Sequence, residues 1–185
     1  AAFSPDEKRI VFRRSEGQLY LFDLESKEQL AELKRESAYG ADIAWSPDGK
    51  HLLDGTWKGE LDVRDPETLQ SVRQYTWPEG KINEIVWDAS HQRYVIYLYQ
   101  DHKGDNRTYS MLFWPHPVLE HEPVKLAFDP GDLDSFSLNE TGTRMVCAPR
   151  YQNTQVIDLQ TGQIVVGPVS TYYRCLVWSP DGTLI

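Results

Sequence analysis

One short phrase recurs along the chain and limits its fold more than any other feature. Its copies are Phe3-Ser4-Pro5-Asp6, Trp45-Ser46-Pro47-Asp48-Gly49 and Trp178-Ser179-Pro180-Asp181-Gly182, with altered forms at Trp87-Asp88-Ala89-Ser90 and Leu138-Asn139-Glu140-Thr141-Gly142. The first residues of these copies stand at positions 3, 45, 87, 138 and 178, so the successive intervals are 42, 42, 51 and 40 residues. A period of about 40 residues is typical of proteins built from tandem structural units.

A second phrase occurs at a constant distance from the first. It reads Asp23-Leu24-Glu25-Ser26, Asp65-Pro66-Glu67-Thr68 and Asp158-Leu159-Gln160-Thr161, each time 20 residues after position 3, 45 or 138. The third unit lacks this phrase and carries a polar, turn-rich insert at residues 101–106. The two phrases together divide the single segment 1–185 into units 1–40, 41–82, 83–134 and 135–173, with the start of a fifth unit at 174–185.

Each unit reads as a series of short strands separated by turns. In the second unit the expected strands are Ala41 to Trp45, Lys50 to Thr56, Glu60 to Asp65 and Leu69 to Tyr75. Their β-branched and aromatic residues favour a pleated sheet, and the Pro and Gly of the first phrase suit a tight turn. Residues 29–36 also fit two helical turns, but they occupy the place of a fourth strand, so we predict a strand there.

Four strands in a unit of about 40 residues are typical of a propeller blade. On the Trp/Phe-Ser-Pro-Asp-Gly phrase and its 42-residue spacing, the chain resembles the WD-repeat family of β-propellers over essentially its whole length. No Gly-His dipeptide precedes a first strand and no Trp-Asp closes a third strand, where the chain has Phe22-Asp23, Arg64-Asp65 and Ile157-Asp158, so the His–Asp network of that family is not assigned. The expected fold is all-β, with four-stranded antiparallel blades in which Trp45, Trp87 and Trp178 fill the space between neighbouring sheets.

The number of units is smaller than the seven or eight blades that the resemblance implies. A half ring would leave apolar blade faces exposed at both ends, and such faces favour association. Three interpretations stay open: an incomplete ring that is part of a longer polypeptide, two copies that complete an eight-bladed ring as a homodimer, and a closed ring of four or five blades. Residues 174–185 would then supply a first strand to another unit.

The composition excludes some classes of partner. Lys and Arg total 19 against 28 Asp and Glu, and the net charge of −9 argues against binding to nucleic acids or anionic membranes. The longest apolar run, Tyr94 to Tyr99, is far shorter than the roughly 18 residues of a membrane-spanning helix. Cys147 and Cys175 lie in apolar runs and are expected to be buried free thiols, which favours a reducing, cytoplasmic location.

The sequence contains no convincing motif for catalysis or metal binding. His116-Pro117-Val118-Leu119-Glu120-His121 differs in spacing from zinc-protease motifs, and its prolines oppose the helix that such motifs need. The acidic run at Asp129, Asp132 and Asp134 is expected to be a loop between blades. No Gly-x-Ser-x-Gly or phosphate-binding glycine motif occurs. We therefore expect no catalytic residues, no metal site, no cofactor and no enzymatic activity.

The spacing also predicts a binding surface. Loops that lead into the first strands of propeller blades gather on one side of the ring, and Tyr and Arg are residue types that anchor protein interfaces. The candidate partner-binding residues there are Asp42, Asn83, Glu84, Asp134, Tyr172, Tyr173 and Arg174. The insert at residues 101–106 and the loop at residues 114–117 are further candidates.

The expected function is a protein–protein interaction scaffold, as the propeller module of a larger protein or assembly. Its partners would be another protein, other domains of the same chain or a second copy, and a rigid sheet scaffold would limit the ordering entropy lost on binding. The alternative is a propeller accessory to an enzyme, similar to those of prolyl oligopeptidases or quinone-dependent dehydrogenases.

Overall fold

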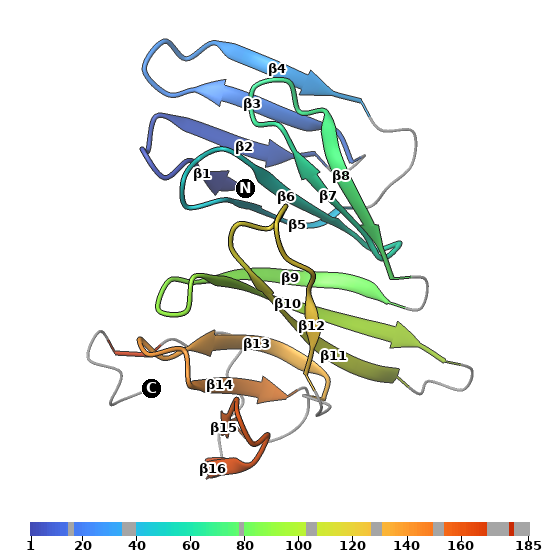
Figure 1. Ribbon diagram of the computed structural model, residues 1–185, viewed down its shortest axis with the longest axis vertical. Coiled ribbons are helices and arrows are strands. Elements are labelled where there is room, and N and C mark those ends of the chain that lie inside the picture. The colour runs from blue at the N-terminus through green and yellow to red at the C-terminus, as the bar shows by residue number, and fades with distance from the viewer. Residues whose placement is uncertain are drawn as a thin grey trace. The chain divides into compact units, whose positions relative to one another are not determined.

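Every regular element of the described chain is a β-strand. The computed structural model describes residues 1–14, 17–34, 40–77, 80–102, 107–126, 131–149, 154–169 and 178–179. In these ranges sixteen strands form four sheets of four strands, and in each sheet spatial neighbours are also neighbours in sequence (Figure 1). The described residues form no helix that could cross a membrane. The expected all-β architecture of four-stranded antiparallel sheets is confirmed.

The contacts divide the chain into two compact units, which are described separately. The first unit consists of residues 1–86 and 96–100. Its first sheet contains β1 (Ala2–Phe3), β2 (Arg9–Arg13), β3 (Leu19–Asp23) and β4 (Gln29–Leu33). Its second sheet contains β5 (Gly40–Trp45), β6 (Leu52–Thr56), β7 (Glu60–Arg64) and β8 (Ser71–Thr76). The strand predicted within residues 29–36, where a helix was the alternative, is present as β4.

The second compact unit consists of residues 87–95 and 101–185, so the division passes through the third sheet. The third sheet contains β9 (Lys81–Asp88), β10 (Arg93–Asp101), β11 (Arg107–Pro115) and β12 (Val124–Lys125). The fourth sheet contains β13 (Leu133–Leu138), β14 (Arg144–Pro149), β15 (Thr154–Asp158) and β16 (Ile164–Val169). The strands β5, β9 and β13 are the first strands of their sheets. They begin one or two residues before positions 41, 83 and 135, where the sequence repeats were expected to start.

The first repeated phrase forms the same turn in the first two sheets. The Ser46 hydroxyl donates to the Asp48 carboxylate at 2.6 Å and accepts from the backbone N–H of His51 at 2.8 Å. Ser4 makes both bonds at the same two distances, to Asp6 and from Arg9. These hydrogen bonds satisfy a buried hydroxyl and close the hairpin between the first and second strands.

The glycine of this phrase has a conformational role. Gly49 has a φ of 70°, in the left-handed region that glycine adopts without steric cost, and Gly142 of the fourth sheet has a φ of 58°. Glu7 holds the same place in the first sheet with a φ of 57°. The turn therefore imposes its backbone geometry even where the sequence supplies no glycine.

The second repeated phrase forms the turn between the third and fourth strands. The Asp65 carboxylate accepts from the backbone N–H groups of Glu67 and Thr68 at 3.0 and 2.8 Å. Asp158 accepts the equivalent bond from the N–H of Thr161 at 2.8 Å. Hydrogen bonds to the ionised form lower the pKa of Asp65 and of Asp158, so both side chains are carboxylates at neutral pH.

The core of the first unit lies between its two sheets. We define the back face of the first sheet by Val11, Arg13, Leu19 and Leu21, and the front face of the second sheet by Leu52, Asp54, Asp62 and Arg64; strand pairing places each set on one side of its sheet. Val11, Leu19 and Leu21 pack with Trp45, Leu52 and Leu69 in one buried cluster. Burial of these side chains contributes roughly 25 cal/mol for each Å² of apolar surface removed from water.

Tryptophan side chains join a sheet to the next repeat. The Trp45 indole N–H donates to the carbonyl of Ala2 at 3.1 Å, and the Arg9 guanidinium lies 5.0 Å from the ring centre. In the second unit, Trp178 donates in the same way to the carbonyl of Ser137 at 3.0 Å. Both acceptors directly precede the first residue of their phrase. The predicted place of Trp45 between neighbouring sheets is confirmed, and Trp178 packs on the fourth sheet in the same way, with the rest of its own repeat outside the described residues.

Candidate functional site

Two acidic residues of the predicted surface lie close together in the first unit. Asp42 and Glu84 hold the same place in β5 and β9, three residues before Trp45 and Trp87. The Asp42 carboxylate accepts the backbone N–H of Ile43 at 2.8 Å and that of Ile85 at 2.8 Å. These bonds join β5 to the start of the next repeat and orient the Asp42 carboxyl group toward the Glu84 segment.

The Glu84 carboxyl group has an unusual protonation equilibrium. Burial, and secondarily the neighbouring charge of Asp42, raise the pKa of Glu84 from 4.5 to about 7. Near neutral pH this side chain therefore exchanges between a neutral hydrogen-bond donor and a carboxylate. Asn83 beside it is exposed and supplies an amide that can donate or accept.

The remaining predicted residues are placed less completely. Asp134 lies in β13 between Leu133 and Ser135, where the register of pairing with β14 shifts, and its side chain is outside the described part. Tyr172, Tyr173 and Arg174 lie outside the described residues. The described structure thus brings Asp42 and Glu84 together, places Asn83 next to Glu84 along β9, and leaves the other four candidates as predictions.

Of the two loop candidates, the loop at residues 114–117 makes internal contacts, and residues 103–106 of the insert lie outside the described residues. The Trp114 side chain is fully buried and its indole N–H donates to the carbonyl of His121 at 3.0 Å, so it is not presented to a partner. His116 packs edge-on against Trp87 with 5.8 Å between ring centres. Arg107, which follows the insert, donates from its guanidinium to Asp101 at 2.8 Å, and both side chains are exposed. Within the described ranges no three His, Cys, Asp or Glu side chains converge as ligands for a metal ion.

Cys147 lies in the fourth sheet as a buried free thiol. Its Sγ lies 3.6 Å from the carbonyl oxygen of Gln155, and burial raises the pKa of the thiol to about 12. A thiol with this pKa is a poor nucleophile and a poor metal ligand at neutral pH. The expectation of a buried free thiol is confirmed for this residue; Cys175 lies outside the described residues.

A buried network of charges crosses between the two sheets of the first unit. The Arg64 guanidinium donates to Asp54 at 2.6 Å and to Asp62 at 2.5 Å, and all three side chains are buried. Arg13 reaches across from the back face of the first sheet, pairs with Asp54 and donates to the carbonyl of Gly55 at 3.1 Å. Each charge has an opposite partner, as a buried ionic group requires.

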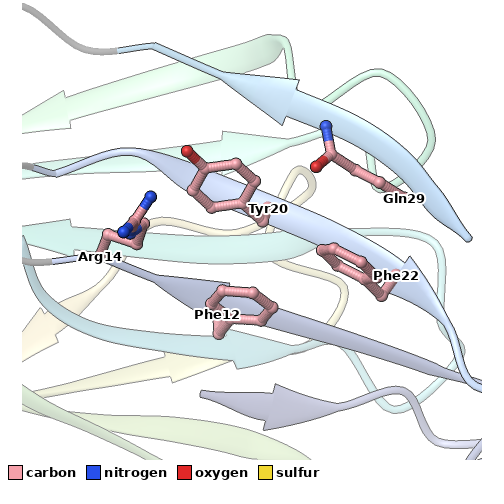
Figure 2. Close-up of a pocket in the computed structure, with 5 residues that line it drawn as sticks. All are labelled: Phe12, Arg14, Tyr20, Phe22 and Gln29. Atoms are coloured by element: carbon pink, nitrogen blue, oxygen red, sulfur yellow. The ribbon is translucent and has the colours of Figure 1, made fainter. Parts of the chain in front are cut away.

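A hollow with an aromatic wall lies on the outer side of the first sheet and was not predicted as a site. We define the front face of the first sheet by Ile10, Phe12, Tyr20 and Phe22. The ring of Phe12 stacks on those of Tyr20 and Phe22, with 5.5 Å between centres in both pairs. The hollow measures about 270 Å³, and its lining residues project to one side of the sheet (Figure 2): Phe12, Arg14, Tyr20, Phe22 and Gln29.

Comparison with known proteins supports the fold. No protein-family model matches the chain. WD repeat-containing protein 1 of Bos taurus is 25% identical to it over 95 residues, which are 48% of this chain and 16% of that protein.

Three solved structures align with most of the chain. Dihydro-heme d1 dehydrogenase NirN in complex with DHE has a TM-score of 0.74 and 23% identity, over 92% of this chain and 36% of that one. The β-propeller domain of Cps50 (Swd1) from Myceliophteria thermophila has a TM-score of 0.69 and 14% identity, over 97% and 58%. A chain of the mitotic checkpoint complex has a TM-score of 0.64 and 17% identity, over 89% and 49%.

The coverage and the sequence identity of these matches limit what they show about this chain. The chain spans less than two thirds of the length of each of these proteins. Identities below 25% carry the fold and not the activity. Together with the four antiparallel sheets, they show that the chain has the fold of a WD-like β-propeller segment.

Proposed function

We propose that this WD-like propeller segment is a non-enzymatic module for protein–protein interaction. The observation that carries the proposal is the carboxyl pair Asp42 and Glu84 on consecutive first strands, with the exposed Asn83 adjacent to Glu84 in the sequence. Asp134, Tyr172, Tyr173 and Arg174 complete the proposed surface. The likeness to a propeller domain and to a chain of a multiprotein complex supports a protein partner.

The chemistry of the carboxyl pair indicates what the partner offers. A segment with an exposed Arg or Lys would pair with the ionised form of Glu84 and lower its pKa. Binding of such a segment therefore strengthens as the pH rises through about 7, where Glu84 loses its proton. The net charge of −9 favours the approach of a cationic partner.

A calorimetric titration with a hexa-arginine peptide tests this proposal. Wild-type protein should bind the peptide more tightly at pH 8 than at pH 6, and Glu84→Gln should remove that pH dependence. Glu67→Gln, at an exposed residue of a turn, is the matched control for the loss of one negative charge. Equal affinity of the wild type and Glu84→Gln at both pH values would contradict this binding surface.

The predicted aromatic part of the surface has its own test. Tyr173→Ala and Arg174→Ala should weaken the binding of a protein partner while the circular-dichroism spectrum and the unfolding midpoint stay unchanged. Unchanged affinity in both variants would remove these residues from the surface.

The second candidate function is an accessory propeller of an enzyme. The likeness to the dihydro-heme d1 dehydrogenase NirN favours this alternative. It predicts a bound chromophore or a catalytic domain in the same polypeptide. An absorbance spectrum and a metal assay on the purified protein distinguish the two functions, because a stoichiometric cofactor would contradict the non-enzymatic proposal.

Partners and location complete the proposal. A second copy is a further partner, with two chains completing an eight-bladed ring. A cytoplasmic location is proposed on the two cysteines, of which Cys147 is a buried free thiol.

A further inference from the structure

Trp57 is a large apolar side chain that the fold leaves at the surface of the first unit. It lies in the turn between β6 and β7 and is 46% exposed, whereas Trp45 and Trp114 are 6% and 0% exposed. Tryptophan is enriched among the residues whose burial contributes most to protein binding. Its exposed indole is therefore a candidate contact residue, and neither repeated phrase includes it.

Hydrogen bonds fix the turn that carries Trp57. The backbone N–H of Gly59 donates to the carbonyl of Thr56 at 3.1 Å. The buried Thr56 hydroxyl accepts from the backbone N–H groups of Lys58 and Glu60 at 3.3 and 3.2 Å. The residues on the far side of the turn are thus tied to one buried threonine, and the turn does not depend on the indole for its shape.

Two residues that follow β8 support the same turn. The backbone N–H of Trp77 donates to the carbonyl of Gly59 at 2.8 Å, and that of Gly80 donates to the carbonyl of Trp77 at 3.0 Å. Gly59 has a φ of 76°, and a Cβ atom there would collide with the carbonyl oxygens of Trp77 and Gly80. Because the backbone under Trp57 is fixed before binding, a partner that contacts the indole does not have to order it.

The turn lies at the same edge of the second sheet as the carboxyl pair. Strand pairing sets Thr56, at the end of β6, opposite Gly40, at the start of β5. Asp42 follows Gly40 by two residues, and its carboxylate accepts the backbone N–H of the residue after Glu84. All of these residues belong to the first compact unit. The topology therefore brings Trp57 to the edge of the sheet where Asp42 and Glu84 lie.

The charges at this edge indicate what each part of it can bind. Lys58, next to Trp57, is exposed and positive, so a cationic side chain placed over the indole would meet a like charge. An uncharged aromatic ring meets no such repulsion and can stack on the indole. Asp42 and Glu84 are acidic and suit a guanidinium or ammonium group. The edge therefore fits a segment that carries an aromatic ring as well as a basic side chain.

We propose that Trp57 anchors this binding edge and selects a partner segment in which an aromatic residue stands next to a basic one. The aromatic ring packs on Trp57, and the basic side chain pairs with the carboxyl groups of Asp42 and Glu84. The inference rests on the proposed function, since it names the kind of segment that the proposed surface recognises. A purely basic segment uses the carboxyl pair alone and binds more weakly.

Calorimetric titration with two peptides of equal charge tests the role of Trp57. One peptide consists of three Arg-Trp repeats and the other of three Arg-Ala repeats, so that only the rings differ. Wild-type protein should bind the Arg-Trp peptide about tenfold more tightly, because its rings bury apolar surface against the indole.

Variants of Trp57 show whether this residue causes the preference. Trp57→Ala should lower the affinity for the Arg-Trp peptide to that for the Arg-Ala peptide, and Trp57→Phe should keep part of the difference. Val72→Ala, at an exposed apolar residue of β8, is the matched control and should behave like the wild type. Circular dichroism checks the folding of each variant, and Trp57→Gln replaces Trp57→Ala if the alanine variant does not fold.

Two outcomes would overturn the inference: equal affinity of the wild type for the two peptides, or a preference for the Arg-Trp peptide that survives the loss of the indole. The proposed carboxyl surface is tested separately, by the pH dependence of Arg-Ala binding and its removal in Glu84→Gln. If that pH dependence is present without a ring preference, only the role of Trp57 is contradicted. A ring preference that depends on Trp57 but comes without pH dependence would contradict the carboxyl surface and support the ring site.

Discussion

The front faces of the first and second sheets have the same backbone plan and opposite chemistry. Phe12, Tyr20 and Phe22 of the first sheet stack as aromatic rings, and the residues at the same places of the second sheet are Asp54, Asp62 and Arg64. The second face is covered by the first sheet, which supplies Arg13 to pair with Asp54. The first face has no such counterpart among the described residues.

The difference shows that the strand plan and the surface chemistry are specified separately. Turns and strand pairing depend on the repeated phrases, which the two sheets share. The side chains between the turns depend on what covers the face, because a buried carboxylate is stable only when its partner is present. A repeated fold can thus hold a different interface at each junction.

The largest effect is expected at the covered charge network. Asp54→Ala leaves Arg13 and Arg64 without the carboxylate that they share, and should lower the free energy of unfolding by about 3–5 kcal/mol. The equivalent change Phe12→Ala, at a half-exposed ring, should cost about 1 kcal/mol. Urea unfolding measures both variants, and equal losses would show that the two faces are equally covered.

The next effect concerns the leading aromatic residues of the two phrases. Trp45 is 6% exposed and Phe3 is 63% exposed. Trp45→Ala should therefore cost about 3 kcal/mol, through a cavity and a lost hydrogen bond, whereas Phe3→Ala should cost less than about 0.5 kcal/mol in dilute solution. Thermal unfolding at low protein concentration gives the values; a large loss for Phe3→Ala would place that ring in a buried site.

Measuring the free energy of unfolding over a range of pH distinguishes the contribution of Glu84 from that of the charge network around Asp54. Glu84 keeps its proton in the folded protein up to a pKa of about 7, whereas its ordinary value is 4.5. Between these values the folded state binds the extra proton, so stability should fall as the pH rises from about 4.5 to 7, and this contribution should be constant above that range.

The expected loss across this range is about 2 kcal/mol, reduced from the full shift because the side chain is partly exposed. Glu84→Gln should flatten the profile of unfolding free energy against pH, and Asp54→Ala should lower the whole profile while its slope in this range remains. A slope that persists in Glu84→Gln would assign the titration to another group.

The smallest effect is expected where the two sheets are alike. Ser4→Ala and Ser46→Ala each remove a buried hydroxyl with matching hydrogen bonds, and each should cost about 1 kcal/mol. Urea unfolding should give the same loss for both variants within error. Clearly unequal losses would mean that the covering of a sheet also affects its turns.

The sequence was a good guide to the fold because turns depend on local chemistry. The two phrases predicted the sheets, and Ser46 with Asp48 and Asp65 with Thr68 form the turns that their residue types suggest. The strand β4 was also predicted correctly, since its place in the repeat outweighed the helical pattern of residues 29–36.

The candidate site was predicted in part. Asp42 and Glu84 share one position in the repeat, so counting residues was enough to bring them together, but the high pKa of Glu84 depends on burial that no local pattern contains. The aromatic front face of the first sheet was not predicted, although the sequence contains an indication of it. Leu19 to Phe22 are apolar without alternation, as in a strand covered on both sides.

The reactivity of the Cys147 thiol should report local opening of the fourth sheet. With its Sγ against the Gln155 carbonyl and a pKa of about 12, it should react with an alkylating reagent only when the fourth sheet opens. The alkylation rate at this one position, followed by peptide mass, would therefore time the opening of the sheet under native conditions. A ligand that stabilises the closed sheet would lower the alkylation rate of Cys147 without contacting its sulfur.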